Sequence, residues 1–215
     1  AVRRADNEAM VAAAVEHFGR LDVLFTAAGV SHGGYRSGDL DASRKRMLER
    51  VDNVATPWVP FLELTVDEFQ AVLDVNLTGT LLAVQSVAAH LVDAGHPGSI
   101  ITVASIMAVS DTGPVPYNVS KAGVWMLTKI AARVLAPRGI RVNAIGPGPI
   151  DTPILRSGRS PEVFAEHEKV LTRSVPMGRL GQPDEVAVSV DFLLSDKASF
   201  ISGQLIHPNG GQLMW

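Results

Sequence analysis

Apolar residues at helical spacing predict that the chain opens with an amphipathic helix over residues 5–18. One stripe of this helix carries Met10, Val11, Ala14, Val15 and Phe18. Gly19 predicts its end. The next apolar run, LDVLFTAAG at 21–29, has no polar alternation, and it predicts a buried parallel strand that leads into a turn of small residues.

Strand-like and helix-like patterns alternate through the rest of the chain. Thr65 and Glu68 form a capping box, which predicts the start of a long apolar helix over about 66–93. The other predicted helices cover about 117–136, 161–172 and 183–194, and the other predicted strands cover 98–105, 140–148 and 203–211. This alternation predicts a parallel sheet in an α/β fold, and with no internal repeat or linker we expect a single domain over 1–215.

Two stretches have no simple pattern. In the stretch 30–64, SRKRMLER (43–50) predicts a short charged helix and ATPWVPF (55–61) a proline-rich loop, so we expect a solvated insertion more than a flap over a site. The stretch 151–180 is rich in loops, and we expect it to form a mobile substrate lid.

The composition is that of a folded globular protein, with 215 residues, 47% hydrophobic and 19% charged. A net charge of -3 gives no basic field, so we expect no nucleic-acid or membrane partner. No apolar run approaches the roughly 20 residues that span a bilayer. There is no cysteine, which excludes disulfides and thiolate metal sites. We expect no metal site and a cytoplasmic location.

Candidate chemistry gathers at the carboxyl ends of the predicted strands, where open α/β sheets bind ligands. Tyr117 and Lys121 lie four residues apart, on one face of a helix that follows the second strand. A phenol has an ordinary pKa of about 10. A nearby ammonium lowers that pKa, so the pair can donate or accept a proton near neutrality. The simpler alternative is a solvated lysine beside a core tyrosine.

Two further polar residues fit the same region. Ser105 ends a predicted strand twelve residues before Tyr117, where its hydroxyl can face the same crevice. Asn76 lies inside an apolar helix, although asparagine is a poor helix former and a buried amide needs partners. Asn76 either binds a water that extends a proton path to Lys121, or it satisfies neighbouring backbone.

Together with these residues, several segments in order resemble the classical short-chain dehydrogenase/reductase family over nearly the whole chain. They are TAAG (26–29), VNLTGT (75–80), TVAS (102–105), YNVSK (117–121), RVNAIGPGPIDTP (141–153), GRLGQPDEVA (178–187) and FISGQLIHPNGG (200–211). The resemblance implies a Rossmann-like, doubly wound parallel sheet. It also implies an NAD(P)-dependent oxidoreductase, an alcohol dehydrogenase or ketoreductase, that transfers hydride between NAD or NADP and a carbonyl or secondary alcohol.

The resemblance also assigns roles to residues. Tyr117 is the expected general acid/base, Ser105 orients the substrate oxygen, and Asn76 holds a water of the proton relay. Lys121 lowers the Tyr117 pKa and holds the nicotinamide ribose. The expected cofactor contacts are Ala27, Ala28 and Gly29 on the adenosine side, Tyr117 and Lys121, and Pro147, Gly148, Ile150 and Thr152 at the nicotinamide.

By the same resemblance, we expect a homo-oligomer, a dimer or tetramer, that forms through the helices carrying Asn76 and Tyr117. The identity of the small-molecule substrate, the direction of reaction and the choice between NAD and NADP stay open.

The chain departs from the family pattern at its start, because it contains no T-G-x-x-x-G-x-G motif. We therefore expect the N-terminal strands of the fold to be missing from this sequence, which makes 1–215 a partial domain and leaves strand 21–28 as an exposed apolar edge. A natural short chain that has lost cofactor binding is the alternative to a fragment.

Two other functions follow from this absence. One is a cofactor-independent lyase such as the family's halohydrin dehalogenases, which use arginine where this chain has Lys121. The other is a non-catalytic binding or scaffold protein. The intact set of Asn76, Ser105, Tyr117 and Lys121 favours the oxidoreductase.

Overall fold

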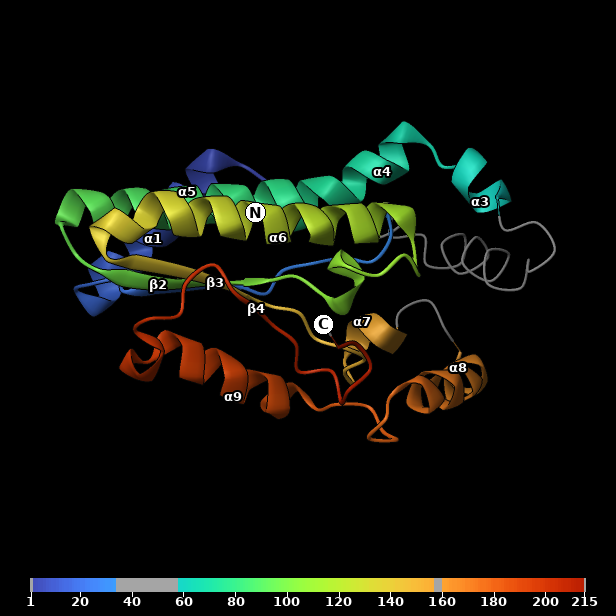
Figure 1. The fold of residues 1–215 in the computed structure, drawn as a ribbon. Helices are drawn as coiled ribbons and strands as arrows, with labels where there is room; N and C mark the ends of the chain where they lie inside the picture. Colours follow the sequence, from blue (N-terminus) through green and yellow to red (C-terminus); the bar gives the residue numbers. More distant parts are fainter. Residues whose placement is uncertain (1, 34–57, 157–159, 215) are drawn as a thin grey trace.

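The computed structural model describes residues 2–33, 58–156 and 160–214. In these residues, β1 (Val23–Thr26), β2 (Gly98–Val103), β3 (Ile140–Ile145) and β4 (Leu205–Ile206) form one parallel sheet in the order β1-β2-β3-β4. Helices lie on both sides of the sheet (Figure 1). The predicted α/β, Rossmann-like fold is therefore confirmed.

Alternation along the central strands builds two cores, one on each face of the sheet. Ile100 of β2 packs with residues of α1 (Arg4–Phe18), α5 (Gly79–Ala94) and α6 (Val115–Leu135). The next residue, Ile101, points to the opposite face and packs with Leu193 of α9 (Pro183–Leu194). Because helices cover both faces, β2 and β3 are buried on both sides.

The predicted helix ends are confirmed where the sequence carries a strong local signal. α1 ends at Gly19, which adopts the left-handed conformation with φ 78°. The Thr65–Glu68 capping box forms and starts α4 (Val66–Leu73). The shorter helical elements are α3 (Val59–Leu62), α7 (Pro153–Arg156), α8 (Pro161–Ser174), η3 (Ile106–Ala108), η4 (Ala136–Arg138) and η5 (Asp196–Ala198).

The segment predicted as a proline-rich loop is partly helical. Val59–Leu62 form one helical turn, with a proline in the first turn, where its missing N–H removes no helical hydrogen bond. The charged helix predicted at 43–50, and most of the 30–64 insertion, lie outside the described residues.

The long apolar helix continues from Val66 to Ala94 through α4, the π-helical segment η2 (Asp74–Thr78) and α5. By length and composition it could cross a membrane, so the expectation that no apolar run is long enough was wrong. It packs against α1 and α6, and it buries Val84, Val87 and Leu91 in the core beside the sheet. These contacts are those of a core helix.

Strand β1 differs from the other long strands because it is half exposed. Val23 and Phe25 are 45% and 44% exposed. No described strand pairs with the outer side of β1, which lies at one edge of the sheet. The prediction of a buried strand was therefore wrong, whereas the predicted apolar edge is confirmed.

Candidate active site

Three elements bring the four predicted catalytic residues to the carboxyl-end side of the sheet. Asn76 lies in η2, Ser105 caps η3 just after β2, and Tyr117 and Lys121 lie in the first turns of α6. The Ser105 side chain lies close enough to the Tyr117 phenol to lower its pKa. The Lys121 Nζ lies 5.6 Å from the centre of the Tyr117 ring. The arrangement joins a proton donor, a second hydroxyl and a cation.

The amide of Asn76 is 1% exposed, and its hydrogen bonds reach backbone far away in the sequence. Its Oδ1 accepts from the Val30 N–H at 2.8 Å, and its Nδ2 donates to the Val30 carbonyl at 2.9 Å. Nδ2 also donates to the Ser120 Oγ at 3.0 Å. Of the two interpretations of Asn76, these bonds support satisfaction of neighbouring backbone.

A π-helical turn places Asn76 at this point. The wider turn of η2 leaves the Asn76 carbonyl to accept from the Thr80 hydroxyl at 2.7 Å. Helix α6 approaches η2 closely because position 123 is glycine, where a Cβ would lie 2.8 Å from a methyl of Leu77. The glycine and the π turn together bring Asn76 to Ser120.

Lys121 is 4% exposed, and its Nζ donates to the Val103 carbonyl at 2.8 Å. Burial penalises the charged form and lowers the Lys121 pKa to about 8. The ammonium is therefore partly deprotonated slightly above neutral pH. A nearby ligand or charge can then change its protonation state.

The pKa of Tyr117 lies above its ordinary value, opposite to the predicted direction. Burial of the phenol raises it, and the Ser105 hydrogen bond lowers it by less. The Lys121 Nζ donates to the Val103 carbonyl, and burial lowers the pKa of Lys121 itself. The prediction that Lys121 lowers the Tyr117 pKa was wrong for this structure.

On the predicted adenosine side, the turn after β1 reaches the catalytic residues at Gly29. A Cβ at this position would lie 3.4 Å from the Asn76 Oδ1 and 3.5 Å from the Lys121 Nζ. Ala27 and Ala28 are exposed beside it. The buried Thr26 hydroxyl has no hydrogen-bond partner in the described part of the chain. The space beside Gly29 and this free hydroxyl fit a bound polar group such as the sugar and phosphate part of a dinucleotide.

On the predicted nicotinamide side, the loop after β3 runs beside Ser105. The Pro147 carbonyl accepts from the N–H of Ile106, the residue after Ser105, at 3.1 Å. The Gly148 N–H donates to the Pro208 carbonyl at 3.1 Å. The Thr152 hydroxyl donates to the Ile150 carbonyl at 3.3 Å. This loop thus lies beside Ser105. The turn at Gly29 lies beside Lys121.

Val30 and Ser120, for which the sequence predicted no role, also bond to Asn76. Ser120 is fully buried, accepts from Asn76, and donates to the Tyr117 carbonyl at 2.7 Å. Its place directly before Lys121, on the inner face of α6, is a signal that could have identified it. Val30 contributes only backbone atoms, so no side-chain pattern could reveal its role.

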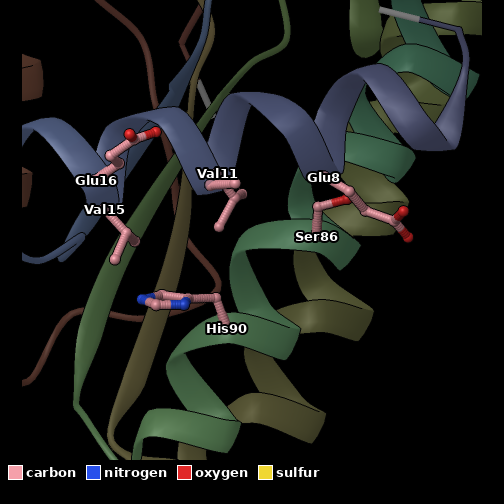
Figure 2. Close-up of a pocket in the computed structure, with 7 residues that line it drawn as sticks. Glu8, Val11, Val15, Glu16, Ser86 and His90 are labelled. Atoms are coloured by element: carbon pink, nitrogen blue, oxygen red, sulfur yellow. The ribbon is translucent and has the colours of Figure 1, made fainter.

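A separate groove lies between α1 and α5 (Figure 2). It is lined by Glu8, Val11, Ala12, Val15, Glu16, Ser86 and His90. None of the predicted site residues lines it, so it is distinct from the site at the strand ends.

Comparison with known proteins identifies the family. A family model described as enoyl-(acyl carrier protein) reductase matches residues 51–212. A 3beta-hydroxysteroid dehydrogenase 1 of Eggerthella lenta is 37% identical over 201 residues, which are 91% of this chain and 70% of that protein. A 3-oxoacyl-[acyl-carrier-protein] reductase FabG of Thermotoga maritima is 36% identical over 198 residues, 92% of this chain and 68% of that protein.

A solved structure of ElxO with NADP bound has a TM-score of 0.76 and 27% identity, and the match covers 98% of this chain and 75% of ElxO. The chain belongs to the short-chain dehydrogenase/reductase family of oxidoreductases. The sequence prediction of the family and of an NAD(P)-binding Rossmann-like fold is confirmed.

Proposed function

We propose that this protein is an NAD(P)-dependent oxidoreductase that interconverts a carbonyl compound and a secondary alcohol, with Tyr117 as the general acid/base. The observation that carries the proposal is the convergence of Tyr117, Ser105 and Lys121 beside Gly29. The dinucleotide, when bound, supplies or accepts the hydride. The names of both curated relatives, a dehydrogenase and a reductase, support this class.

The chain's own residues would handle the proton and the substrate oxygen. In reduction, the Tyr117 hydroxyl gives its proton to the carbonyl oxygen, and in oxidation the phenolate accepts the alcohol proton. The Ser105 hydroxyl hydrogen-bonds the same oxygen and orients it. A pKa of Tyr117 above its ordinary value keeps the hydroxyl protonated at neutral pH, ready for the reductive direction.

Lys121 and Asn76 would act around this proton donor. Lys121 faces Gly29 and would hold the nicotinamide ribose. Asn76 connects the turn after β1 with the first turns of α6 through Val30 and Ser120, so we assign it as a positioning residue. A ligand hydroxyl near Lys121 would find an ammonium whose pKa of about 8 makes it sensitive to that contact.

The cofactor and substrate would lie along the carboxyl-end edge of the sheet. Ala27, Ala28 and Gly29 would line the adenosine side, and Pro147, Gly148, Ile150 and Thr152 would border the nicotinamide. The segment 151–180 would cover the substrate as a lid. In its described part, the Arg156 guanidinium lies 4.6 Å from the centre of the Phe164 ring, which connects α7 to α8.

Self-association is proposed through α6. Its surface exposes an apolar stripe made of Val119, Met126, Ile130 and Val134. A second copy of the chain would cover this stripe, as the resemblance to oligomeric relatives implies. Ile130→Asp should lower the mass measured by sedimentation, whereas Val170→Asp, at an exposed position of α8, should not. Equal masses for wild type and Ile130→Asp would contradict this interface.

The proposal is tested by titrating the protein with NADH and NADPH while nicotinamide fluorescence and thermal stability are followed. We expect saturable binding of one dinucleotide and a melting temperature that rises with its concentration. Gly29→Ala should keep the fold, because its Cβ meets only ordinary contacts, but should weaken binding by filling the space between Asn76 and Lys121. Absence of saturable binding, or unchanged affinity in Gly29→Ala, would contradict the proposed site.

A further inference from the structure

The backbone hydrogen-bond partners of the loop after β3 change halfway along the loop. Its first part pairs with the segment around β4, where the Gly146 N–H donates to the Ile206 carbonyl at 2.8 Å. Beyond Gly148, in the part of the chain that the structure describes, Gly181 is the backbone partner of Pro149 and Asp151. The Gly181 N–H donates to the Pro149 carbonyl at 3.0 Å, and the Asp151 N–H donates to the Gly181 carbonyl at 2.9 Å. The two residues that flank Ile150 are therefore held by one glycine.

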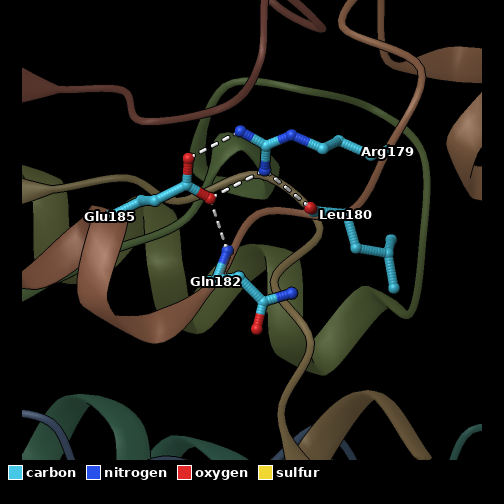
Figure 3. A network of polar contacts seen from close by, with 4 residues as sticks. All are labelled: Arg179, Leu180, Gln182 and Glu185. Carbon is cyan, nitrogen blue, oxygen red and sulfur yellow. Dashed lines mark hydrogen bonds and ion pairs between the residues drawn. The ribbon is translucent and has the colours of Figure 1, made fainter.

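The carboxylate of Glu185 holds residues on either side of Gly181, namely Arg179 and Gln182 (Figure 3). Arg179 donates to its Oε1 and Oε2 at 2.7 and 2.8 Å, and the Gln182 N–H donates to Oε2 at 2.8 Å. Arg179 also donates to the Leu180 carbonyl at 3.1 Å. We call Arg179, Gln182 and Glu185 the Glu185 clamp, because one carboxylate fixes the chain on both sides of Gly181.

The side chain of Ile150 lies directly against Gly181. A Cβ at position 181 would lie 2.6 Å from the Cδ1 of Ile150, so a larger residue would displace this methyl group. The position of Ile150 therefore depends on its flanking hydrogen bonds and on the place of Gly181. A shift of Gly181 would disturb both the hydrogen bonds that flank Ile150 and the packing of its side chain.

We propose that Glu185 is a positioning residue for the nicotinamide end of the site, and that it acts through Gly181 on Ile150. This inference rests on the proposed function, in which Ile150 borders the nicotinamide. The Arg179 and Glu185 side chains are 54% and 48% exposed. An ion pair this exposed adds little to global stability. Its effect is therefore expected on the local position of the chain around Gly181.

Glu185→Ala tests the proposal, with Asp22→Ala as the matched control. The control removes another exposed arginine–carboxylate pair, Arg20–Asp22, beside the amino end of β1. The readouts are amide hydrogen exchange at Asp151 and Gly181, and the Kd values for NADPH or NADH and for the matching ADP-ribose, which lacks the nicotinamide.

Glu185→Ala should raise exchange at both amides and weaken dinucleotide binding on the order of tenfold, the low end of what loss of an outer-shell partner costs at metal sites. Binding of the ADP-ribose should change less than about twofold, because the adenosine side does not touch the clamp. Glu185→Gln, which keeps an acceptor for the Gln182 N–H, should fall between Glu185→Ala and wild type. Asp22→Ala should match wild type in every readout.

Two results would overturn the inference while leaving the proposed function intact. One is unchanged exchange in Glu185→Ala. The other is an equal weakening of dinucleotide and ADP-ribose, which marks a general structural role. A wild-type protein that binds neither NADH nor NADPH would instead overturn the proposed function, and the role of the clamp with it.

Discussion

The two halves of the candidate site are held in different ways. Around Tyr117, side chains that are almost fully buried, Asn76 and Lys121, bond to backbone carbonyls and N–H groups in the interior. Around Ile150, the chain is held by backbone pairing with Gly181 and by a half-exposed ion pair. A buried polar network is costly to break, whereas a surface pair is not. Loss of the buried Asn76 amide should therefore lower the stability of the fold, whereas loss of the surface ion pair should not.

The largest effect is expected at the centre of the buried half. Tyr117→Phe removes one hydroxyl, and turnover should fall by about 10²–10⁴-fold, the usual contribution of general acid–base catalysis. The ring stays in place, so the melting temperature should change little. Absorbance of the reduced nicotinamide with a ketone that wild type reduces, and a thermal melt, measure the two quantities. Turnover within about tenfold of wild type would contradict the assigned role.

Asn76→Ala sharpens the comparison by breaking the buried network without touching a reacting atom. The substitution removes the side-chain amide that bonds to the Val30 N–H and carbonyl. An unsatisfied buried polar group costs about 1–3 kcal/mol. Urea unfolding should show this loss. Gln85→Ala, at an exposed position of α5 paired with Arg4, should stay within about 0.5 kcal/mol of wild type. Equal stability of the two variants would show that the network does not support the fold.

The pH dependence of stability tests the buried half through Lys121. The folded pKa of Lys121, about 8, lies below its unfolded value near 10.5. Between these values the unfolded chain binds more protons, so the contribution of Lys121 to stability rises with pH from about 8 to 10.5. Urea unfolding at both ends of this window should show a larger gain for wild type than for Lys121→Met.

Lys129→Met is the matched control for this effect, because Lys129 is an exposed lysine on the same helix. It should follow the wild-type pH profile. If Lys121→Met also follows it, burial of the ammonium does not set its pKa.

Local signals allowed much of the fold to be predicted. Gly19, the Thr65–Glu68 capping box and the apolar runs of β2 and β3 act over a few residues, and each formed as expected. The grouping of Ser105, Tyr117 and Lys121 was also predictable, because parallel strands and the helices after them bring such residues to one edge.

Other features depend on contacts that no local pattern records. The π turn at Asn76 is a one-residue widening inside an unbroken apolar helix, and its partner Val30 is 46 residues away. The direction of the Tyr117 pKa shift depends on burial of the phenol, which outweighs the effect of Ser105. The pair Gln182 and Glu185 did carry a capping signal, but its link to Ile150 runs through backbone bonds of Gly181.

The central claim is that hydride reaches a carbonyl carbon while Tyr117 provides the proton, and isotope transfer tests it most directly. The protein would be given NADPH or NADH deuterated at the reactive C4 position, together with ketones, and the products analysed by mass spectrometry. The account predicts an alcohol that carries deuterium on the carbinol carbon with wild type and a strongly reduced yield with Tyr117→Phe. An alcohol without deuterium, or an equal yield from the variant, would contradict it.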